Sequence, residues 1–514
     1  MNTFTVTILN NDQKIQVEEG KDLLEVVQEA KQELDAPCGG QGKCGKCKVL
    51  IDGVEALACQ TKVDRDMVVT LPDKAENAIL TEGIVATTTP DGSNKYVLAF
   101  DIGTTTVVAY LLNGETGEQM ATASVLNPQT TYGGDVIARV QYQITNPEST
   151  ELKECIRTAM QALAREAANK GGIAVEDITL VTMVGNTAMH HLMMGIDPKS
   201  LTTPPYMPKV YEKLSLPLHD VLPIFPAGEF RALPNIAGFV GADTVGCMLA
   251  TRFDKFENNT LMIDIGTNGE MVIGNKDRRI CCSTAAGPAF EGARISMGMR
   301  GASGAIDHCE WKNGTVEYHV IGDVTPIGIC GSGVLDLIAA LLDAGIINWR
   351  GKLDTDTYYM YTDESSGAER KMFYYQIPGT DVKLTQQDVR EIQLAKSAIR
   401  SGIDLLIKNL GIQTDDVQDI LLAGAFGNYM SPKAACRIGL IPPSLLSKIK
   451  SIGNAAGEGS KLAALNIEEF EYAGKLHEGV EFLELASLPE FMSMYGTNLN
   501  YPKQNMSMEE EDDD

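Results

Sequence analysis

The fold of most of this chain follows from the stretch Leu261-Met262-Ile263-Asp264-Ile265-Gly266-Thr267. An apolar run, typical of a buried β-strand, leads directly into an aspartate, a glycine and a threonine. The same Asp-Ile-Gly-Thr sequence stands at residues 101–104, where it follows the apolar run 96–100. Two copies of one strand-and-turn unit indicate an internal duplication, with a second half that begins near residue 260.

Each turn carries groups suited to phosphate and magnesium. A glycine in a tight turn lets backbone N–H groups approach phosphate oxygens, threonine hydroxyls add donors, and an aspartate can hold Mg²⁺ through water. One such turn would fit an ordinary hairpin, whereas two after matching strands favour a phosphate site. We expect Asp101 and Asp264 to organise Mg²⁺ and to be catalytic. The expected phosphate contacts are Thr104, Thr105 and Thr267, and Asn268 is expected to belong to the same cofactor-binding site.

A third glycine turn follows late in the chain. The strand-like run Ile420-Leu421-Leu422 enters Ala423-Gly424-Ala425-Phe426-Gly427, before a helical stretch at residues 432–438. With the two aspartate turns, this order resembles the phosphate-1, phosphate-2 and adenosine motifs of the ASKHA superfamily, in which two ribonuclease-H-like halves close over ATP. The resemblance implies adenosine contacts from Gly424, Phe426 and Gly427, although Ala425 separates the glycines that the usual motif pairs.

Other residues could complete such a cleft. Gly331 and Ser332 open a helix expected at residues 334–342, so their N–H groups could face ribose or phosphate, with backbone packing as the alternative. Glu291 and Asp243 are the candidates for positioning the attacking water. His190 and His191 point about 100° apart on a helix, so they fit a cleft or core better than a shared metal ion.

The N-terminal region carries a separate cofactor signature. Cys38, Cys44 and Cys47 have the spacing C-x5-C-x2-C, and Cys59 follows as a fourth thiol. This spacing is one residue longer than the plant-type pattern for a [2Fe-2S] cluster, so these four cysteines are the expected ligands. A zinc site would normally have two C-x2-C pairs, and only Cys44 and Cys47 form one. A thioredoxin-like dithiol would not carry two further cysteines nearby.

The order of elements around these cysteines supports the same interpretation. A hairpin at residues 3–17, a helix from Leu23 through Leu34, the cysteine loop and strands near 48–51 and 67–71 follow one another. This order resembles a β-grasp ferredoxin of the adrenodoxin-like branch. We expect a multidomain α/β protein with a ferredoxin at 1–75, a linker at 76–95, an ASKHA-like ATPase at 96–500 and an acidic disordered tail at 501–514.

Composition restricts the partners and the compartment. The chain has 514 residues and a net charge of −26, which disfavours binding to nucleic acid or anionic membranes. It has no apolar run of about 18 residues, so we expect no membrane span. Its 11 cysteines form no disulfide framework, and this favours the cytoplasm.

Taken together, the segments resemble one family, the reductive activators of corrinoid proteins, in which a [2Fe-2S] ferredoxin is fused to an ASKHA ATPase. The resemblance includes Gly-Asn-Thr-Ala-Met-His-His-Leu at 185–192, Ala-Gly-Pro-Ala-Phe-Glu-Gly at 286–292 and Pro489-Glu490-Phe491. It implies ATP-dependent transfer of one electron through the cluster, reducing cob(II)alamin to cob(I)alamin. The implied partners are a corrinoid protein of a methyltransferase system and a low-potential electron donor, and a homodimer is compatible with it. Larger members carry an extra domain after the ferredoxin.

Three alternatives stay open at this point. The chain could be a small-molecule kinase with a fused ferredoxin, or a nucleotide-binding redox sensor without turnover. Cys330 invites a third comparison, because activators of 2-hydroxyacyl-CoA dehydratases have a similar fold and share a cluster between subunits through a cysteine in a similar loop. A complete set of ferredoxin cysteines upstream argues against that arrangement.

Overall fold

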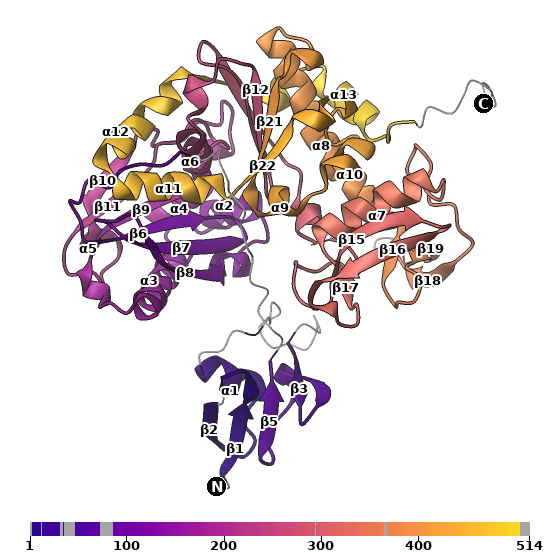
Figure 1. The fold of residues 1–514 in the computed structure, drawn as a ribbon, viewed down its shortest axis with the longest axis horizontal. Helices are drawn as coiled ribbons and strands as arrows, with labels where there is room; N and C mark the ends of the chain where they lie inside the picture. Colours follow the sequence, from indigo (N-terminus) through magenta and orange to yellow (C-terminus); the bar gives the residue numbers. More distant parts are fainter. Residues whose placement is uncertain are drawn as a thin grey trace. The chain divides into compact units, whose positions relative to one another are not determined.

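The computed structural model describes residues 3–11, 13–30, 34, 47–71, 86–292, 294–363 and 367–503 (Figure 1). Contacts divide the chain into two compact units, an N-terminal one that contains Met1–Asn77 and a second that contains most of the chain from Ala78 onward. In the described residues, no helix combines the length and the apolar character that crossing a membrane requires.

The N-terminal unit is a mixed sheet with one helix packed on it. The sheet has the strand order β2-β1-β5-β3-β4, and β1 pairs antiparallel with β2 and parallel with β5. Side chains of α1, such as Val26 and Val27, share one core with Val6 and Ile8 of β1. This arrangement confirms the β-grasp expectation. The elements are β1 (Thr3–Ile8), β2 (Gln13–Glu18), α1 (Leu23–Glu29), β3 (Lys48–Ile51), β4 (Val54–Leu57) and β5 (Met67–Thr70).

The second unit is built on two six-stranded sheets with matching topology. In the first, β6 pairs parallel with β9 and antiparallel with β7. In the second, β12 pairs parallel with β21 and antiparallel with β13. The central strand of each sheet is therefore the one that ends in Asp-Ile-Gly-Thr, which confirms the duplicated ribonuclease-H-like architecture.

The two sheets have the orders β10-β11-β9-β6-β7-β8 and β22-β21-β12-β13-β14-β23. The strands of the first are β6 (Tyr96–Ile102), β7 (Thr106–Asn113), β8 (Gln119–Leu126), β9 (Ile178–Gly185), β10 (Leu214–Pro217) and β11 (Glu229–Ala232). Those of the second are β12 (Thr260–Ile265), β13 (Gly269–Gly274), β14 (Arg279–Thr284), β21 (Asp419–Ala423), β22 (Ile449–Gly453) and β23 (Val480–Phe482).

Two helices join the halves, α6 (Ala242–Thr251) and α11 (Ala455–Leu465). α11 follows β22 of the second sheet in the chain but packs on β6 and β9 of the first (Figure 1). The helix backbones touch where both have glycine, because a Cβ on Gly459 would lie 2.1 Å from the carbonyl oxygen of Gly246. Thr182 of β9 also donates to the carbonyl oxygen of Ser460 at 2.9 Å, which fixes α11 against the first sheet.

Long helices cover the outer faces of the sheets. α3 (Glu151–Gly171) packs on β7 and β8, and α8 (Gln386–Leu410) packs on β13 and β14. The remaining helices are α2 (Val136–Thr145), α4 (Thr187–Met194), α5 (Leu218–Val221), α7 (Gly331–Asp343), α9 (Gly424–Tyr429), α10 (Pro432–Arg437), α12 (Ile467–Leu476) and α13 (Phe491–Asn498).

An inserted lobe lies between β14 and α8 in the chain (Figure 1). It holds two three-stranded sheets, β16-β15-β17 and β18-β19-β20, with α7 packed on β15. The apolar face of α7 shares one core with β12 and α8, so the lobe is continuous with the second half. Its strands are β15 (Ala305–Lys312), β16 (Thr315–Val320), β17 (Gly328–Ile329), β18 (Tyr358–Thr362), β19 (Glu369–Gln376) and β20 (Lys383–Thr385).

Candidate functional site

The two Asp-Ile-Gly-Thr turns meet between the halves. Each turn is closed by a backbone hydrogen bond, from Gly103 N–H to the carbonyl oxygen of Thr106 and from Gly266 N–H to that of Asn268, both at 2.9 Å. The hydroxyl oxygens of Thr105 and Thr267 lie 3.3 Å apart. The fold thus places equivalent turns from distant parts of the chain within hydrogen-bond distance of each other.

Glu291 connects these two hydroxyls. Its Oε2 accepts a hydrogen bond from Thr105 at 2.7 Å, and its Oε1 accepts one from Thr267 at 2.6 Å. The residue ends a short 3₁₀ turn, Pro288–Glu291, between glycines at positive φ, Gly287 at 78° and Gly292 at 77°. A carboxylate therefore lies where donors from both halves converge, and the same donors could bind an oxyanion of a ligand.

Four acidic side chains surround the ends of the two central strands. Asp101, Asp243 and Asp264 are partly buried, and Glu270 is buried. Burial raises the pKa of Asp101 to about 6. Burial, with the charges of Asp243 and Asp101, raises the pKa of Asp264 to about 7. Burial and the charges of Asp243 and Asp264 also raise the pKa of Glu270.

Such a cluster of carboxyls fits a bound cation, because like charges in a buried place repel unless a positive charge balances them. Within the described residues, no three carboxylate, thiol or imidazole groups are arranged to hold one ion. Carboxylates can hold a hydrated Mg²⁺ through its water molecules.

Neighbouring side chains orient two of these acids. Asn454, directly before α11, donates from Nδ2 to Asp101 at 2.7 Å while its Oδ1 accepts from Gly457 N–H. The Cys247 thiol, on α6, lies 3.7 Å from Oδ2 of Asp264. Burial and the charge of Asp264 raise the pKa of Cys247, so its thiol stays protonated as a donor.

Thr104 and Asn268 have supporting contacts. The Thr104 hydroxyl is buried and accepts from Asn186 Nδ2 at 3.0 Å, and Asn186 in turn caps α4. The Asn268 side chain hydrogen-bonds to Glu270, which lowers the pKa of that acid against the larger effect of burial. Aligning the two repeats pairs Thr104 with Thr267. In the structure it is the next residue, Thr105, that faces Thr267.

Two residues expected near adenosine, Gly424 and Phe426, lie close to an acid or to Gly331, which was expected near ribose or phosphate. Gly424 begins α9 at a φ of 85°, and a Cβ there would lie 2.5 Å from Oδ1 of Asp264. The Phe426 ring stacks on Phe290, with centroids 5.1 Å apart. A Cβ on Gly331 would lie 2.9 Å from the Phe426 ring, so the start of α7 reaches the same place.

Gly427 and Ser332 have local roles. Gly427 faces Leu422, because a Cβ added to Gly427 would lie 3.3 Å from the Cβ of Leu422. The Ser332 hydroxyl is buried and donates to the carbonyl oxygen of Asp307 at 2.9 Å. α7 begins at Gly331, before the expected start at residue 334, because the helical pattern of apolar residues does not include that glycine. The helix expected at residues 432–438 is α10, whereas the short α9 before it was not expected.

The described cysteines of the expected cluster lie close in the fold. Cys47 is buried directly before β3, and its carbonyl oxygen accepts from Ala58 N–H at 2.8 Å. Cys59 follows Ala58, so the β3–β4 hairpin returns the chain to Cys47. Cys38 and Cys44 lie outside the described residues. A backbone that brings the residue before Cys59 to Cys47 after a β-grasp helix fits an iron-sulfur cluster.

His190, His191 and Cys330 are buried, and their contacts are with nearby backbone and side-chain groups. His190 and His191 are fully buried, and burial lowers the pKa of His190 to about 3 and that of His191 to about 4. His191 contacts the backbone on both ring nitrogens, at Thr187 and Lys209, which supports a core role. Cys330 is buried at the start of α7, with its sulfur 3.3 Å from the Ser332 hydroxyl.

Sequence reasoning missed Asn454 and Cys247 as partners of the aspartates. Asn454 had a usable signal, because the segment Ile452-Gly453-Asn454 ends a strand in a glycine turn, like the other site segments. Cys247 had none, because its contact depends on the packing of α6 beside β12.

Three family models match consecutive parts of the chain. A 2Fe-2S iron-sulfur cluster binding domain matches residues 6–64, the RACo middle region matches residues 96–256, and the C-terminal ASKHA domain of RACo matches residues 258–511.

Whole-chain comparisons agree. The corrinoid activation enzyme RamQ of Eubacterium limosum is 40% identical over 415 residues, which are 78% of this chain and 70% of that protein. A Co(II) methylated amine-specific corrinoid protein reductase of Methanosarcina barkeri is 26% identical over 454 residues, 80% of this chain and 78% of that one. A solved reductive activator for corrinoid, iron-sulfur protein superposes with a TM-score of 0.71 at 26% identity, covering 97% of this chain and 98% of the other. The chain belongs to the family of corrinoid activation enzymes, with a [2Fe-2S] ferredoxin domain joined to an ASKHA domain.

Proposed function

We propose that this protein uses ATP to reduce cob(II)alamin to cob(I)alamin in the corrinoid protein of a methyltransferase system. One electron from an external low-potential donor enters the ferredoxin domain and leaves to cobalt. A transfer to an acceptor of lower potential is unfavourable by a factor of ten for every ~59 mV, so it needs work from another reaction. The observation that carries the proposal is the Thr105–Glu291–Thr267 contact, which links the RACo middle region to the ASKHA domain in a chain that also has a ferredoxin domain.

The cysteines supply the redox part. Cys38, Cys44, Cys47 and Cys59 would hold the [2Fe-2S] cluster as thiolates, and the bound cluster would supply one-electron transfer. The close approach of Cys47 to the Ala58–Cys59 turn supports a ligand set assembled from both ends of the β3–β4 hairpin.

The second unit supplies the ATPase part. Asp101 and Asp264 would orient a hydrated Mg²⁺, and Thr105 and Thr267 would donate to phosphate oxygens. Glu291 accepts from both hydroxyls and would position the attacking water once phosphate takes those donors. Phe426, stacked on Phe290, would border the adenosine side with Gly424.

ATP hydrolysis would be coupled to the reduction through the arrangement of the two halves of the second unit. Thr105 belongs to the first half and Thr267 to the second, so a phosphate bound by both favours one arrangement of the halves. A ligand shifts a conformational equilibrium by the difference in its affinity for the two states. Hydrolysis would remove that preference. The arrangement of the two halves would then change, and with it the surface that meets the corrinoid partner.

The test is anaerobic reduction of a cob(II)alamin-loaded corrinoid protein by this protein, a strong reductant and Mg-ATP. We expect the absorbance spectrum of cob(I)alamin to grow only with ATP, and at a rate that falls strongly for Cys47→Ser. Equal spectra with and without ATP would contradict the proposal. ATP-dependent appearance of a phosphorylated small molecule would instead favour a kinase.

A further inference from the structure

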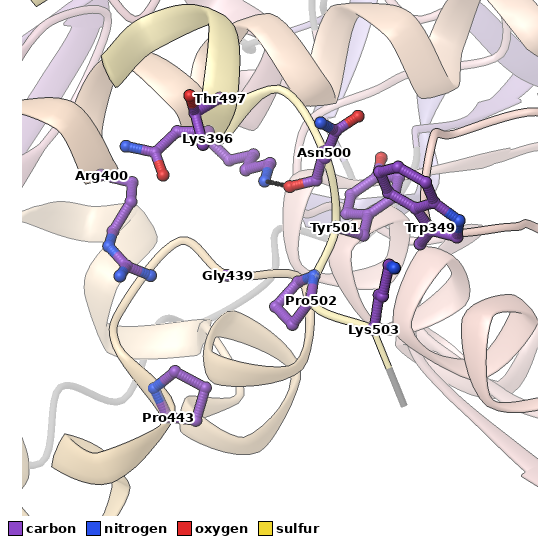
Figure 2. A pocket seen from close by; sticks show the side chains of 11 residues that line it. Trp349, Lys396, Arg400, Gly439, Pro443, Thr497, Asn500, Tyr501, Pro502 and Lys503 are labelled. Carbon is purple, nitrogen blue, oxygen red and sulfur yellow. Dashed lines mark hydrogen bonds between the residues drawn. The ribbon is translucent and has the colours of Figure 1, made fainter. Parts of the chain in front are cut away.

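A cavity with a mostly apolar lining and several charged residues lies away from the aspartate turns. It has a volume of about 400 Å³ and is bordered by α8, the end of α13 and the segment after α13 (Figure 2). None of its lining residues belongs to the ATP site or to the cysteine set. Its charged residues are Lys396 and Arg400 of α8 and Lys503, while Trp349 and Tyr501 supply aromatic surface.

Lys396 is the most unusual of these residues. It is 1% exposed, and its ammonium donates to the carbonyl oxygen of Asn500 and lies 5.1 Å from the centroid of the Tyr501 ring. Across the described part of the chain, no carboxylate forms an ion pair with it. A buried ammonium with one acceptor is costly, because burial removes water without supplying a counter-charge. Burial and the neighbouring Arg400 lower the pKa of Lys396 to about 7.

Arg400 adds a second cation with donors to spare. Its Nε donates to Asp404 at 2.9 Å, and no hydrogen bond from its two terminal nitrogens occurs within the described part of the chain. Figure 2 shows the guanidinium directed toward Pro443, on the cavity side of α8. Lys503 lies 5.0 Å from the centroid of the Trp349 ring. Three basic residues thus line one cavity in a chain whose net charge is −26.

We propose that this cavity binds a small phosphate-bearing anion, at a site separate from ATP. The planar guanidinium of Arg400 suits two phosphate oxygens at once, and Lys396 adds a point charge. The cavity volume lies within the range of ~300–1,000 Å³ usual for small-molecule sites. It exceeds the needs of a bare phosphate, so a phosphomonoester is the favoured ligand over inorganic phosphate.

The full-length protein provides its own reporter, because Trp349 borders the cavity and the chain has only 2 tryptophans. Tryptophan emission is titrated with inorganic phosphate and, separately, with glycerol phosphate, while chloride keeps the ionic strength constant. We expect saturable changes, with glycerol phosphate the tighter ligand. Trp349→Phe should remove the signal, and calorimetry on that variant should still detect binding.

Two variants test the assignment. Lys396→Met and Arg400→Met should each weaken binding at least tenfold, which is about 1.4 kcal/mol. Lys408→Met is the matched control, because Lys408 is an exposed residue of the same helix, paired with Glu490 at 2.8 Å, and its loss should leave affinity unchanged. Thr267→Val should also leave it unchanged, which separates this cavity from the proposed ATP site.

Three results would overturn the proposal. They are a signal that chloride reproduces, unchanged affinity in both cavity variants that keep the wild-type melting temperature, and a tenfold gain in affinity after deletion of residues 504–514. The last would identify the acidic segment Glu509-Glu510-Glu511-Asp512-Asp513-Asp514 as the occupant instead.

Discussion

Replacement of Glu291 by glutamine should separate ATP binding from ATP hydrolysis. The wild-type carboxylate holds two charge-assisted hydrogen bonds, at 2.7 Å from Thr105 and 2.6 Å from Thr267. Bonds to a charged group contribute about 1.5–3 kcal/mol each. A phosphate that takes these donors must replace both bonds and must also approach a negative charge.

Glutamine keeps the shape but removes the charge and turns one acceptor into a donor. We expect the free energy that opposes phosphate binding to fall by about half the contribution of one such bond. ATP affinity should then rise about five- to tenfold, or about 1–1.4 kcal/mol. Hydrolysis should fall by about 10²–10⁴, the usual contribution of a positioned acid or base, which adds about 3–5 kcal/mol to the barrier.

The assay pairs equilibrium binding of a fluorescent ATP analogue with single-turnover hydrolysis, so that binding and chemistry are measured apart. Glu317→Gln is the control, since Glu317 lies exposed on β16. Thr105→Val should weaken ATP binding instead of strengthening it, because it removes a donor that phosphate also needs. Hydrolysis within threefold of wild type in a folded Glu291→Gln protein would refute this account of Glu291.

The remaining predictions concern the cluster, the acids and one glycine. Cys47→Ser should lose the electron paramagnetic resonance signal of a reduced [2Fe-2S] cluster, whereas Cys309→Ser, in the second unit, should keep it; stoichiometric zinc without iron in the wild type would contradict the cluster assignment. Burial raises the pKa of Asp101 to about 6 and that of Asp264 to about 7, so the folded protein favours the protonated acids. In the absence of metal, their stabilising contribution is therefore full below the unfolded pKa of ~4 and is lost as the pH rises through 6 and 7. The melting temperature of the metal-free wild type should therefore fall, relative to Asp264→Asn, between pH 5 and pH 8, and Mg²⁺ should abolish that difference at pH 8; a pH-independent difference would count against the raised pKa values. Gly424→Ala should lower stability by about 1–2 kcal/mol through its positive φ and should also weaken ATP binding, because its Cβ would press on Asp264. Gly345→Ala shares the positive φ, 72°, with open space around it, so an equal loss of ATP affinity there would remove the role assigned to the Gly424 contact.

Much of the architecture was predictable because it depends on local patterns in the sequence. The apolar runs before Asp101 and Asp264 predicted the central strands of two matching sheets, and the hairpin, helix and cysteine order predicted the β-grasp unit. Both signals are short-range, since a buried strand and its turn lie next to each other in the chain. The convergence of Phe426 with Gly331 agrees with the resemblance to ASKHA proteins.

The details that were not predictable depend on contacts between distant segments. Repeat alignment pairs Thr104 with Thr267, but the register of the first turn directs Thr104 to Asn186 and leaves Thr105 facing the second half. Glu291 was a candidate for positioning water, yet its contact with both threonines required the 3₁₀ turn between Gly287 and Gly292. Cys38 and Cys44, which the spacing C-x5-C-x2-C assigns to the cluster, lie outside the described residues, so that part of the ligand set stays a prediction.

The glycine contact between α6 and α11 limits how motion at the aspartates can spread. Asn454 holds Asp101 and directly precedes α11, and Gly459 lies four residues into that helix from Ala455, a rise of about 6 Å. Backbone lies against backbone at this contact, and neither glycine has a side chain that could absorb a displacement by changing rotamer. We therefore expect a shift of Asp101 to be passed on as a small movement of α11 along α6, so that the two halves move together.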